Sequence, residues 1–180
     1  MSCVSTVTGT KHVSTTEAII NLQNSIDKLN LRTEDWQIKF NESKCSVLHI
    51  GKKNPLSEYK LGSTILSSCD FEKDLGVFVD SNLDFEHHIN ETVKKANKLV
   101  GMITHFISYK VKEVMVPLYE TLVRLILEYG NVVWCPKLKG SKKRIEDVRR
   151  RFTKRIIGMH ELEYEERLKS LKLPTVVFFS

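Results

Sequence analysis

Long hydrophobic runs and paired cysteines are both missing from this 180-residue chain. Its four cysteines, Cys3, Cys45, Cys69 and Cys135, form no Cys-x-x-Cys pair and have no histidine at metal-ligand spacing. This argues against a zinc site and against a disulfide-stapled scaffold. No stretch is apolar enough to indicate a signal peptide or a membrane-spanning helix. We therefore expect a soluble protein of the cytoplasm or nucleus that holds no metal and meets no membrane.

The composition indicates a folded, basic protein. At 41% hydrophobic residues the chain can bury a core, as one domain or two small ones. The formal net charge is +6 and the isoelectric point is near 9.1, which favours an anionic partner. Nucleic acid is the commonest such partner for an intracellular basic domain.

The first part of the chain predicts one helix and a small antiparallel sheet. After a weakly ordered lead-in over residues 1–13, a capping box at Ser14 and Glu17 should begin a helix that runs to about Leu31. A strand is expected over 45–50, followed by a hairpin whose turn is Gly62-Ser63. A further strand over 75–79 is expected to be buried on both faces.

The second part predicts a bundle of helices. Apolar residues recur at spacings of three or four from Phe85 to Ile107, behind Asp84 as a candidate N-cap. The segment 112–133 is apolar almost all round and should lie at the bundle centre, with Pro117 near its first turn or at a kink. Two more helices are expected, from about Ser141 to Gly158 and over 161–171. The fold class is therefore α+β, divided into 14–80 and 81–173, with a tail over 174–180.

An ordered series of short motifs runs through about residues 17–173. One group is Trp36, Phe40, Asn41, Lys44 and Cys45, and a later one is Leu75, Gly76 and Val77. The series resembles the distal palm and thumb of the reverse transcriptase of non-LTR (LINE, jockey-type) retrotransposons. The resemblance implies a truncated palm, made of a helix and a small antiparallel sheet with a primer-grip-like hairpin at Leu75, Gly76 and Val77. An all-α thumb-like bundle should follow.

The resemblance also bears on catalysis. Polymerases of this class use two Mg²⁺ ions held by carboxylates. The family's Ala-Asp-Asp motif would fall here at about Val4 to Thr6, and the first acidic residue is Glu17. We therefore expect no bound cofactor and no polymerase activity from this chain alone. By resemblance Lys44 corresponds to the lysine that protonates pyrophosphate, although we favour a solvated lysine here.

Two basic clusters and one single lysine are the candidate nucleic-acid contacts. The stretch 137–155 holds ten Lys or Arg against Glu146 and Asp147, which favours a phosphate-contacting surface over a merely solvated helix face. The second cluster is Lys94, Lys95 and Lys98. Because Glu91 can pair with Lys95 there, a phosphate-contacting surface and a solvated helix face are about equally favoured. The candidates are Arg144, Arg150, Arg151, Lys154 and Arg155, then Lys94, Lys95 and Lys98, and finally Lys73 beside the hairpin.

Other chemistry-bearing residues have simpler explanations. His87 and His88 are adjacent on a predicted helix and point in different directions, so a capping or packing role is expected rather than a metal site. The aromatic residues that lie in or beside apolar stripes are expected in the core rather than stacked on bases. They are Trp36, Tyr119, Tyr129, Trp134 and Phe152.

Three functional interpretations remain open at this stage. The chain is a reverse-transcriptase remnant that is inactive alone, a non-catalytic thumb module that binds RNA or DNA, or a degenerate fragment with no selected role. A thumb supplied in trans to a partner that bears the aspartates is a further option.

Overall fold

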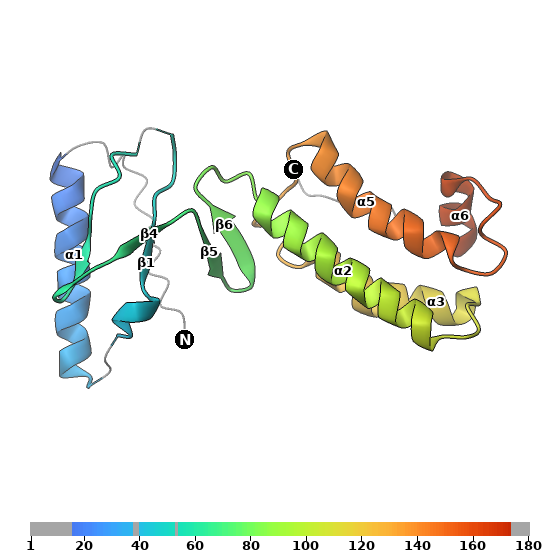
Figure 1. Cartoon of the computed structure of the whole chain (residues 1–180), viewed down its shortest axis with the longest axis horizontal. Coiled ribbons are helices and arrows are strands. Elements are labelled where there is room, and N and C mark those ends of the chain that lie inside the picture. The colour runs from blue at the N-terminus through green and yellow to red at the C-terminus, as the bar shows by residue number, and fades with distance from the viewer. Residues whose placement is uncertain (1–15, 38–39, 53, 174–180) are drawn as a thin grey trace. The chain divides into compact units, whose positions relative to one another are not determined.

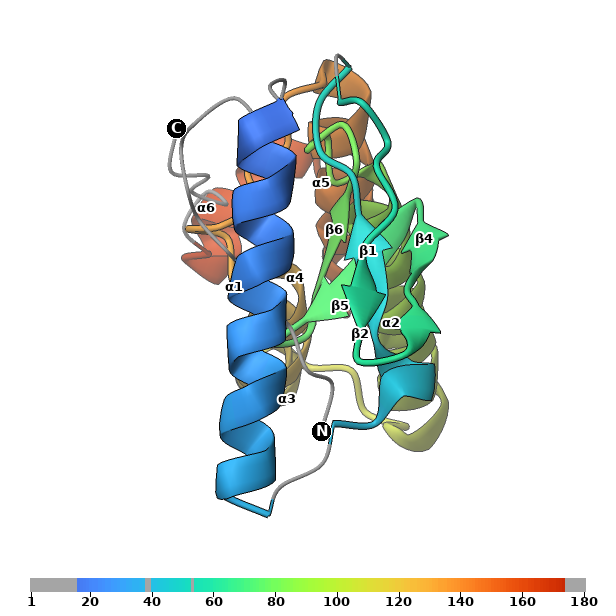
Figure 2. The same cartoon turned by 90° about the vertical axis from the view of Figure 1, so that its left-hand side faces the viewer.

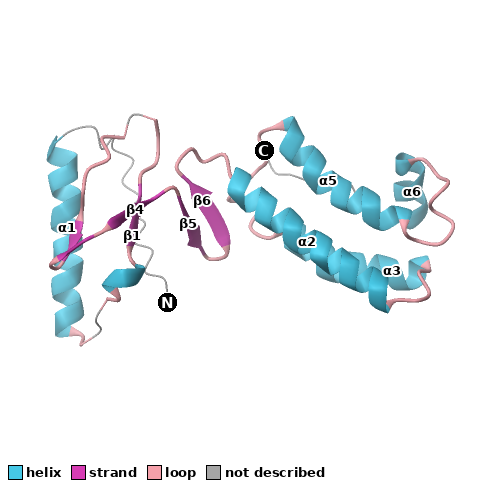
Figure 3. Ribbon diagram, in the orientation of Figure 1, coloured by secondary structure: helices cyan, strands magenta, loops and turns pink. Residues whose placement is uncertain are grey.

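The computed structural model describes residues 16–37, 40–52 and 54–173, and the chain forms two compact units that divide after Leu83. We call Met1–Leu83 the N-terminal unit and Asp84–Ser180 the helical unit. Helices and short strands are both present, as Figures 1 and 3 show, so the α+β class is confirmed in its coarse form. The expected lead-in, the Ser14 cap and the tail lie outside the described residues.

Helix α1 (Thr16–Asp35) stands beside the strands of the N-terminal unit (Figure 2). Its side chains Ile19, Leu22 and Ile26 are half-buried, as their spacing predicts. Gln23 joins the helix to strand β2 (Lys60–Leu61): its Nε2 donates to the Lys60 carbonyl oxygen at 2.9 Å, and the Lys60 amide donates to Gln23 Oε1 at 3.0 Å. The helix runs four residues past its expected end.

The strands do not form the predicted antiparallel sheet. A short 3-10 helix, η1 (Glu42–Lys44), leads into β1 (Ser46–Leu48), which pairs in parallel with β4 (Ser67–Cys69). The long connection between these strands allows β4 to run in the same direction as β1. Within that connection β2 (Lys60–Leu61) and β3 (Thr64–Ile65) form the expected hairpin, with Gly62 at φ +60° in its turn.

The predicted strand over 75–79 is wrong at its start. Strands β5 (Phe71–Asp74) and β6 (Val77–Asp80) form an antiparallel hairpin, and its two-residue turn is Leu75-Gly76. Both turn residues have positive φ, +44° and +92°, as a type I′ turn requires. Leu75 is therefore 86% exposed rather than buried, while Val77 enters the core.

Helix α2 (Glu86–Phe106) opens the helical unit. Asp84 lies one position outside the observed N-cap, Phe85, but still caps the helix, because its Oδ1 accepts the Glu86 amide at 2.9 Å. The predicted apolar stripe is buried at Ile89, Ala96 and Val100. This helix is the best-predicted element of the chain.

The predicted single helix over 112–133 is instead three shorter segments. They are α3 (Lys112–Leu118), the π-helical turn η2 (Tyr119–Val123) and α4 (Arg124–Glu128). Pro117 lacks the amide that an α-helix needs, and the wider π turn follows it directly. Gly130 has φ +68°, which ends the helix before the predicted Val133. One face of these segments is buried, at Met115, Tyr119, Val123 and Leu127.

Two further helices complete the unit. Helix α5 (Lys139–Lys154) starts two residues before the expected Ser141 and ends before the predicted stop at Gly158. Helix α6 (Tyr164–Leu171) starts behind a capping box made by Glu163 and Glu166. The core lies between α2, α5 and the α3–η2–α4 segments. No helix within the described residues is both long enough and apolar enough to span a lipid bilayer.

Candidate nucleic-acid interface

The positive charge of the chain belongs to its helical unit. The N-terminal unit has nine Lys or Arg and ten Asp or Glu, a formal charge of −1. The helical unit has nineteen and twelve, a formal charge of +7. A search for an anion-binding surface therefore begins with the helices.

Helix α5 separates apolar and basic side chains onto different faces. Ile145, Val148 and Phe152 are fully buried. The exposed side chains of α5 are nearly all cationic because its apolar side chains lie on the buried face. We define the α5 basic surface as its exposed Lys and Arg residues together with the C-cap Arg155: Lys139, Lys142, Lys143, Arg150, Arg151, Lys154 and Arg155.

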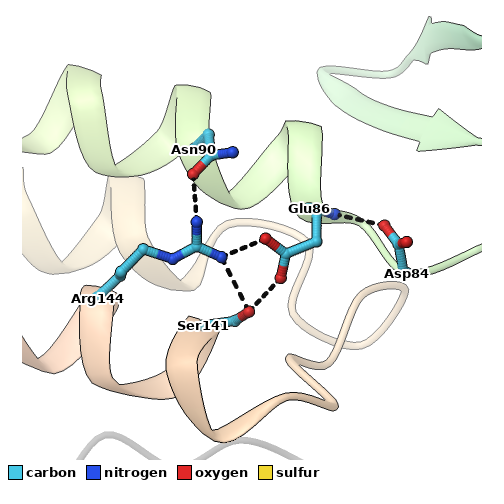
Figure 4. A network of polar contacts seen from close by, with 5 residues as sticks. All are labelled: Asp84, Glu86, Asn90, Ser141 and Arg144. Carbon is cyan, nitrogen blue, oxygen red and sulfur yellow. Dashed lines mark hydrogen bonds and ion pairs between the residues drawn. The ribbon is translucent and has the colours of Figure 1, made fainter.

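Arg144, a predicted phosphate contact, is held by other residues of the same unit (Figure 4). Its guanidinium pairs with Glu86, donates to Asn90 Oδ1 at 2.7 Å and donates to Ser141 Oγ at 3.0 Å. Ser141 Oγ also donates to Glu86. Hydrogen bonds from Ser141 and then from Arg144 lower the pKa of Glu86. Arg144 therefore joins α5 to the first turn of α2, and Glu86 compensates its charge.

The other predicted arginines remain exposed and are oriented by neutral groups. Arg150 stacks over the Tyr164 ring, with its guanidinium carbon 4.6 Å from the ring centroid. Arg151 Nε donates to the Asp147 carbonyl oxygen at 3.1 Å. Arg155 donates to Thr104 Oγ1 on α2 at 2.7 Å. These contacts hold the side chains in place without neutralising them, and Lys154 is exposed beside them.

The second predicted basic cluster lies on α2, which packs against α5 in the same unit. Lys94, Lys95 and Lys98 are all exposed. Glu91 pairs with Lys94 at 2.7 Å, not with Lys95 as expected, and this hydrogen bond lowers the Glu91 pKa. The reach of Arg144 and Arg155 across to α2 shows that the two predicted clusters lie on packed helices.

Arg149, which was not among the candidate contacts, is the one buried basic residue of α5. It belongs to the charged stretch 137–155, yet its side chain is only 1% exposed and lies 3.7 Å from Glu146. Glu146 also accepts the hydroxyl of Tyr164. Burial and this carboxylate raise the Tyr164 pKa. Arg149 is thus part of the interior of the helical unit and is too buried to touch a bound polyanion.

Two predicted site residues, Lys44 and Lys73, lie in the N-terminal unit. Lys44 ends the short helix η1 and is exposed. Lys73, on β5, lies over the Phe78 ring at 5.5 Å and is also exposed. Over residues 16–37, 40–52 and 54–173, no three His, Cys, Asp or Glu side chains gather to hold a metal ion. The positions Val4 to Thr6 lie outside the described residues.

The aromatic predictions are correct in part. Trp134, Tyr119 and Phe152 are buried, and His88 packs against the Trp134 ring at 4.8 Å, which confirms its packing role. Trp36 and Tyr129 are exposed, so their expected place in the core is wrong. Two exposed aromatics that the sequence analysis did not single out follow the apolar stripe of α2: Phe106 and Tyr109.

Comparisons with known proteins give no independent family assignment. The chain matches no model of a protein family, no curated protein and no solved structure. Any assignment of function therefore depends on the sequence resemblance and on the geometry described above.

Proposed function

We propose that the helical unit binds nucleic acid through the α5 basic surface. The observation that carries this proposal is the set of seven exposed Lys and Arg residues at α5, whose opposite face is buried. The formal charge of +7 on this unit supports the same function. Phosphates are the natural partners of such a surface, and contacts to them require no base sequence.

We further propose that the chain is the distal palm and thumb of a non-LTR reverse transcriptase. The motif series over about residues 17–173 supports this family. The β5–β6 hairpin is compatible with it, since the turn falls on Leu75-Gly76 of the primer-grip-like motif. In this proposal the chain holds a primer-template duplex, and phosphate contacts supply the affinity.

Binding to an RNA–DNA hybrid, followed by fluorescence anisotropy, tests the first proposal. The variant K143E/R150E/R151E/K154E should lose affinity by more than about tenfold, because each changed side chain turns phosphate attraction into repulsion. Arg144 and Arg155 are left unchanged because both bond α5 to α2. The control K28E/R32E/K52E/K60E alters the net charge equally but in the N-terminal unit. Equal losses in both variants would contradict a surface localised on α5.

Primer extension tests the second proposal. We expect the purified chain to bind the hybrid without adding nucleotides in Mg²⁺ or Mn²⁺, because the family's metal-binding aspartates correspond to positions that here hold Val4 to Thr6. Metal-dependent, template-directed product from the purified chain would overturn this expectation.

A further inference from the structure

The exposed face of α2 changes from basic to aromatic along its length. Lys95, Lys98, Met102 and Phe106 follow one another at spacings of three, four and four, so they lie on one side of the helix. All four are exposed. Tyr109 follows in the next loop, and the Phe106 and Tyr109 side chains are 77% and 78% exposed. Two large aromatic surfaces therefore continue a line of lysines.

The loop that carries Tyr109 is attached to the rest of the unit. The Ile107 amide donates to the Ile103 carbonyl oxygen at 3.0 Å and continues the helical hydrogen bonding. The Ile157 amide donates to the Lys110 carbonyl oxygen at 2.9 Å, which joins this loop to the segment after α5. With the Arg155–Thr104 hydrogen bond, these contacts bring the C-terminal ends of α2 and α5 together. The α5 basic surface thus ends near the aromatic side chains.

Core packing does not explain the two aromatic residues. Helix α2 already buries Ile89, Ala96 and Val100 on its opposite face. The Phe106 ring meets the exposed His105 ring edge to face, with 5.3 Å between the ring centroids, and remains exposed to solvent. Exposed aromatic rings beside lysines have the chemistry of a single-strand binding surface, where bases stack on rings and cations follow the phosphates.

We propose that Phe106 and Tyr109 stack the unpaired bases of a single-stranded nucleic acid whose phosphates contact Lys95 and Lys98. This inference rests on the proposed function and extends it from a paired duplex to an adjoining unpaired strand. Stacking tolerates every base, so the surface needs no sequence preference.

A membrane surface fits the same residues less well. An interfacial helix inserts a whole apolar face into the lipid headgroup region. The apolar face of α2 is committed to the protein core, which leaves only Met102 and Phe106 of this helix for such an insertion. The lysines that precede the two rings supply the positive charge that a single strand's phosphates require, which insertion into lipid would leave unused.

Three probes, each compared between variants, separate the contributions: a single strand of about 12 nucleotides, a blunt RNA–DNA hybrid and a hybrid with an unpaired overhang. The variant F106L/Y109L keeps apolar bulk but removes the rings. It should bind the single strand and the overhang more weakly by about 30-fold or more and leave the blunt hybrid unchanged, since two base stacks are lost.

Two further variants make the test specific. F106W/Y109W preserves aromatic faces and should retain single-strand affinity, with quenching of a 2-aminopurine base in the strand. L125A/V132A changes exposed apolar residues elsewhere in the helical unit and should alter nothing. Far-UV circular dichroism checks that each variant keeps its fold.

The outcomes of this experiment are distinct. Unchanged single-strand affinity in F106L/Y109L, with salt-sensitive hybrid binding intact, overturns this inference and leaves the proposed function standing. Absence of hybrid binding in the unmodified protein overturns both. Vesicles of phosphatidylserine form a further arm: ring-dependent binding to vesicles without ring-dependent binding to the single strand assigns this face to a membrane instead.

Discussion

At the scale of single residues, His88 makes stability depend on pH. Burial first, and then Lys95 and His87, lower its pKa from 6.5 to about 4. The folded state thus favours neutral imidazole, so its stabilisation is complete above pH 6.5 and is lost as the pH falls toward 4. His88→Phe, which keeps a ring against Trp134, should flatten the unfolding free energy over this range in urea titrations. His160→Asn, at an exposed position, should leave the slope unchanged.

Glu86 makes stability depend on pH in a more acidic range than His88 does. Its pKa lies below the usual 4.5 because of the hydrogen bonds from Ser141 and Arg144. Since the folded state favours the carboxylate, this stabilisation is present above pH 4.5 and is lost as the pH falls through the lowered pKa. Glu86→Gln should therefore lower the melting temperature near neutrality and converge with the unmodified protein in acid. A constant difference at every pH would contradict the network of Figure 4.

For single residues, the sequence predicted the exposed charged side chains better than it predicted which side chains are buried. It identified Arg150, Arg151 and Arg155 as surface cations, because a helix that buries one apolar face exposes the rest. It left Arg149 off the list of contacts but did not predict its burial, which depends on Glu146 and on the packing of the helical unit. Phe106 escaped notice because it adjoins the apolar stripe in sequence but lies off it in space.

At the scale of elements, the β5–β6 turn carries a strained residue. Leu75 has φ +44°, a left-handed conformation that costs a non-glycine residue on the order of 1 kcal/mol. Leu75→Asn should increase the protection of the hairpin amides in native-state hydrogen exchange by about this amount, because asparagine tolerates that conformation. Leu75→Val should reduce it, since β-branching increases the strain. Equal protection in both variants would contradict the turn geometry.

The Phe152 side chain of α5 should contribute strongly to the stability of the helical unit. Phe152 is fully buried, with its ring 5.2 Å from that of Tyr119. Phe152→Ala should lower the unfolding free energy by about 3–5 kcal/mol, from lost apolar burial and the cavity left behind. Val132→Ala, at an exposed position, should change it by less than about 0.5 kcal/mol. Urea unfolding followed by far-UV circular dichroism measures both.

Elements with one dominant local signal were predicted, and elements set by competing signals were not. Helix α2 has a continuous stripe, and the turn at Gly62 has the residue that its backbone requires. A kink at Pro117 was one of the two expected possibilities, but the division into three segments was not predicted, because apolar residues continue on both sides of the proline. The parallel β1–β4 pair was missed because strand direction depends on tertiary contacts and not on the strand residues themselves.

At the scale of the whole molecule, the charge asymmetry between the units predicts how affinity depends on salt. Each phosphate contact releases counterions, so about five contacts from the α5 basic surface give a slope of log affinity against log salt of about −4 to −5. Neutralising Lys143, Arg150, Arg151 and Lys154 to Gln should reduce the magnitude of this slope by about one for each lost contact.

The matched control decides whether surface position or net charge matters. Gln at Lys28, Arg32, Lys52 and Lys60 removes the same charge from the N-terminal unit, whose formal charge is already −1. If the bound phosphates lie on α5, this control should keep the original slope, because side chains that contact no phosphate release no counterions from the nucleic acid. An equal reduction of the salt slope in both variants would mean that affinity depends only on the total charge of the chain. The α5 basic surface would then not be the binding site.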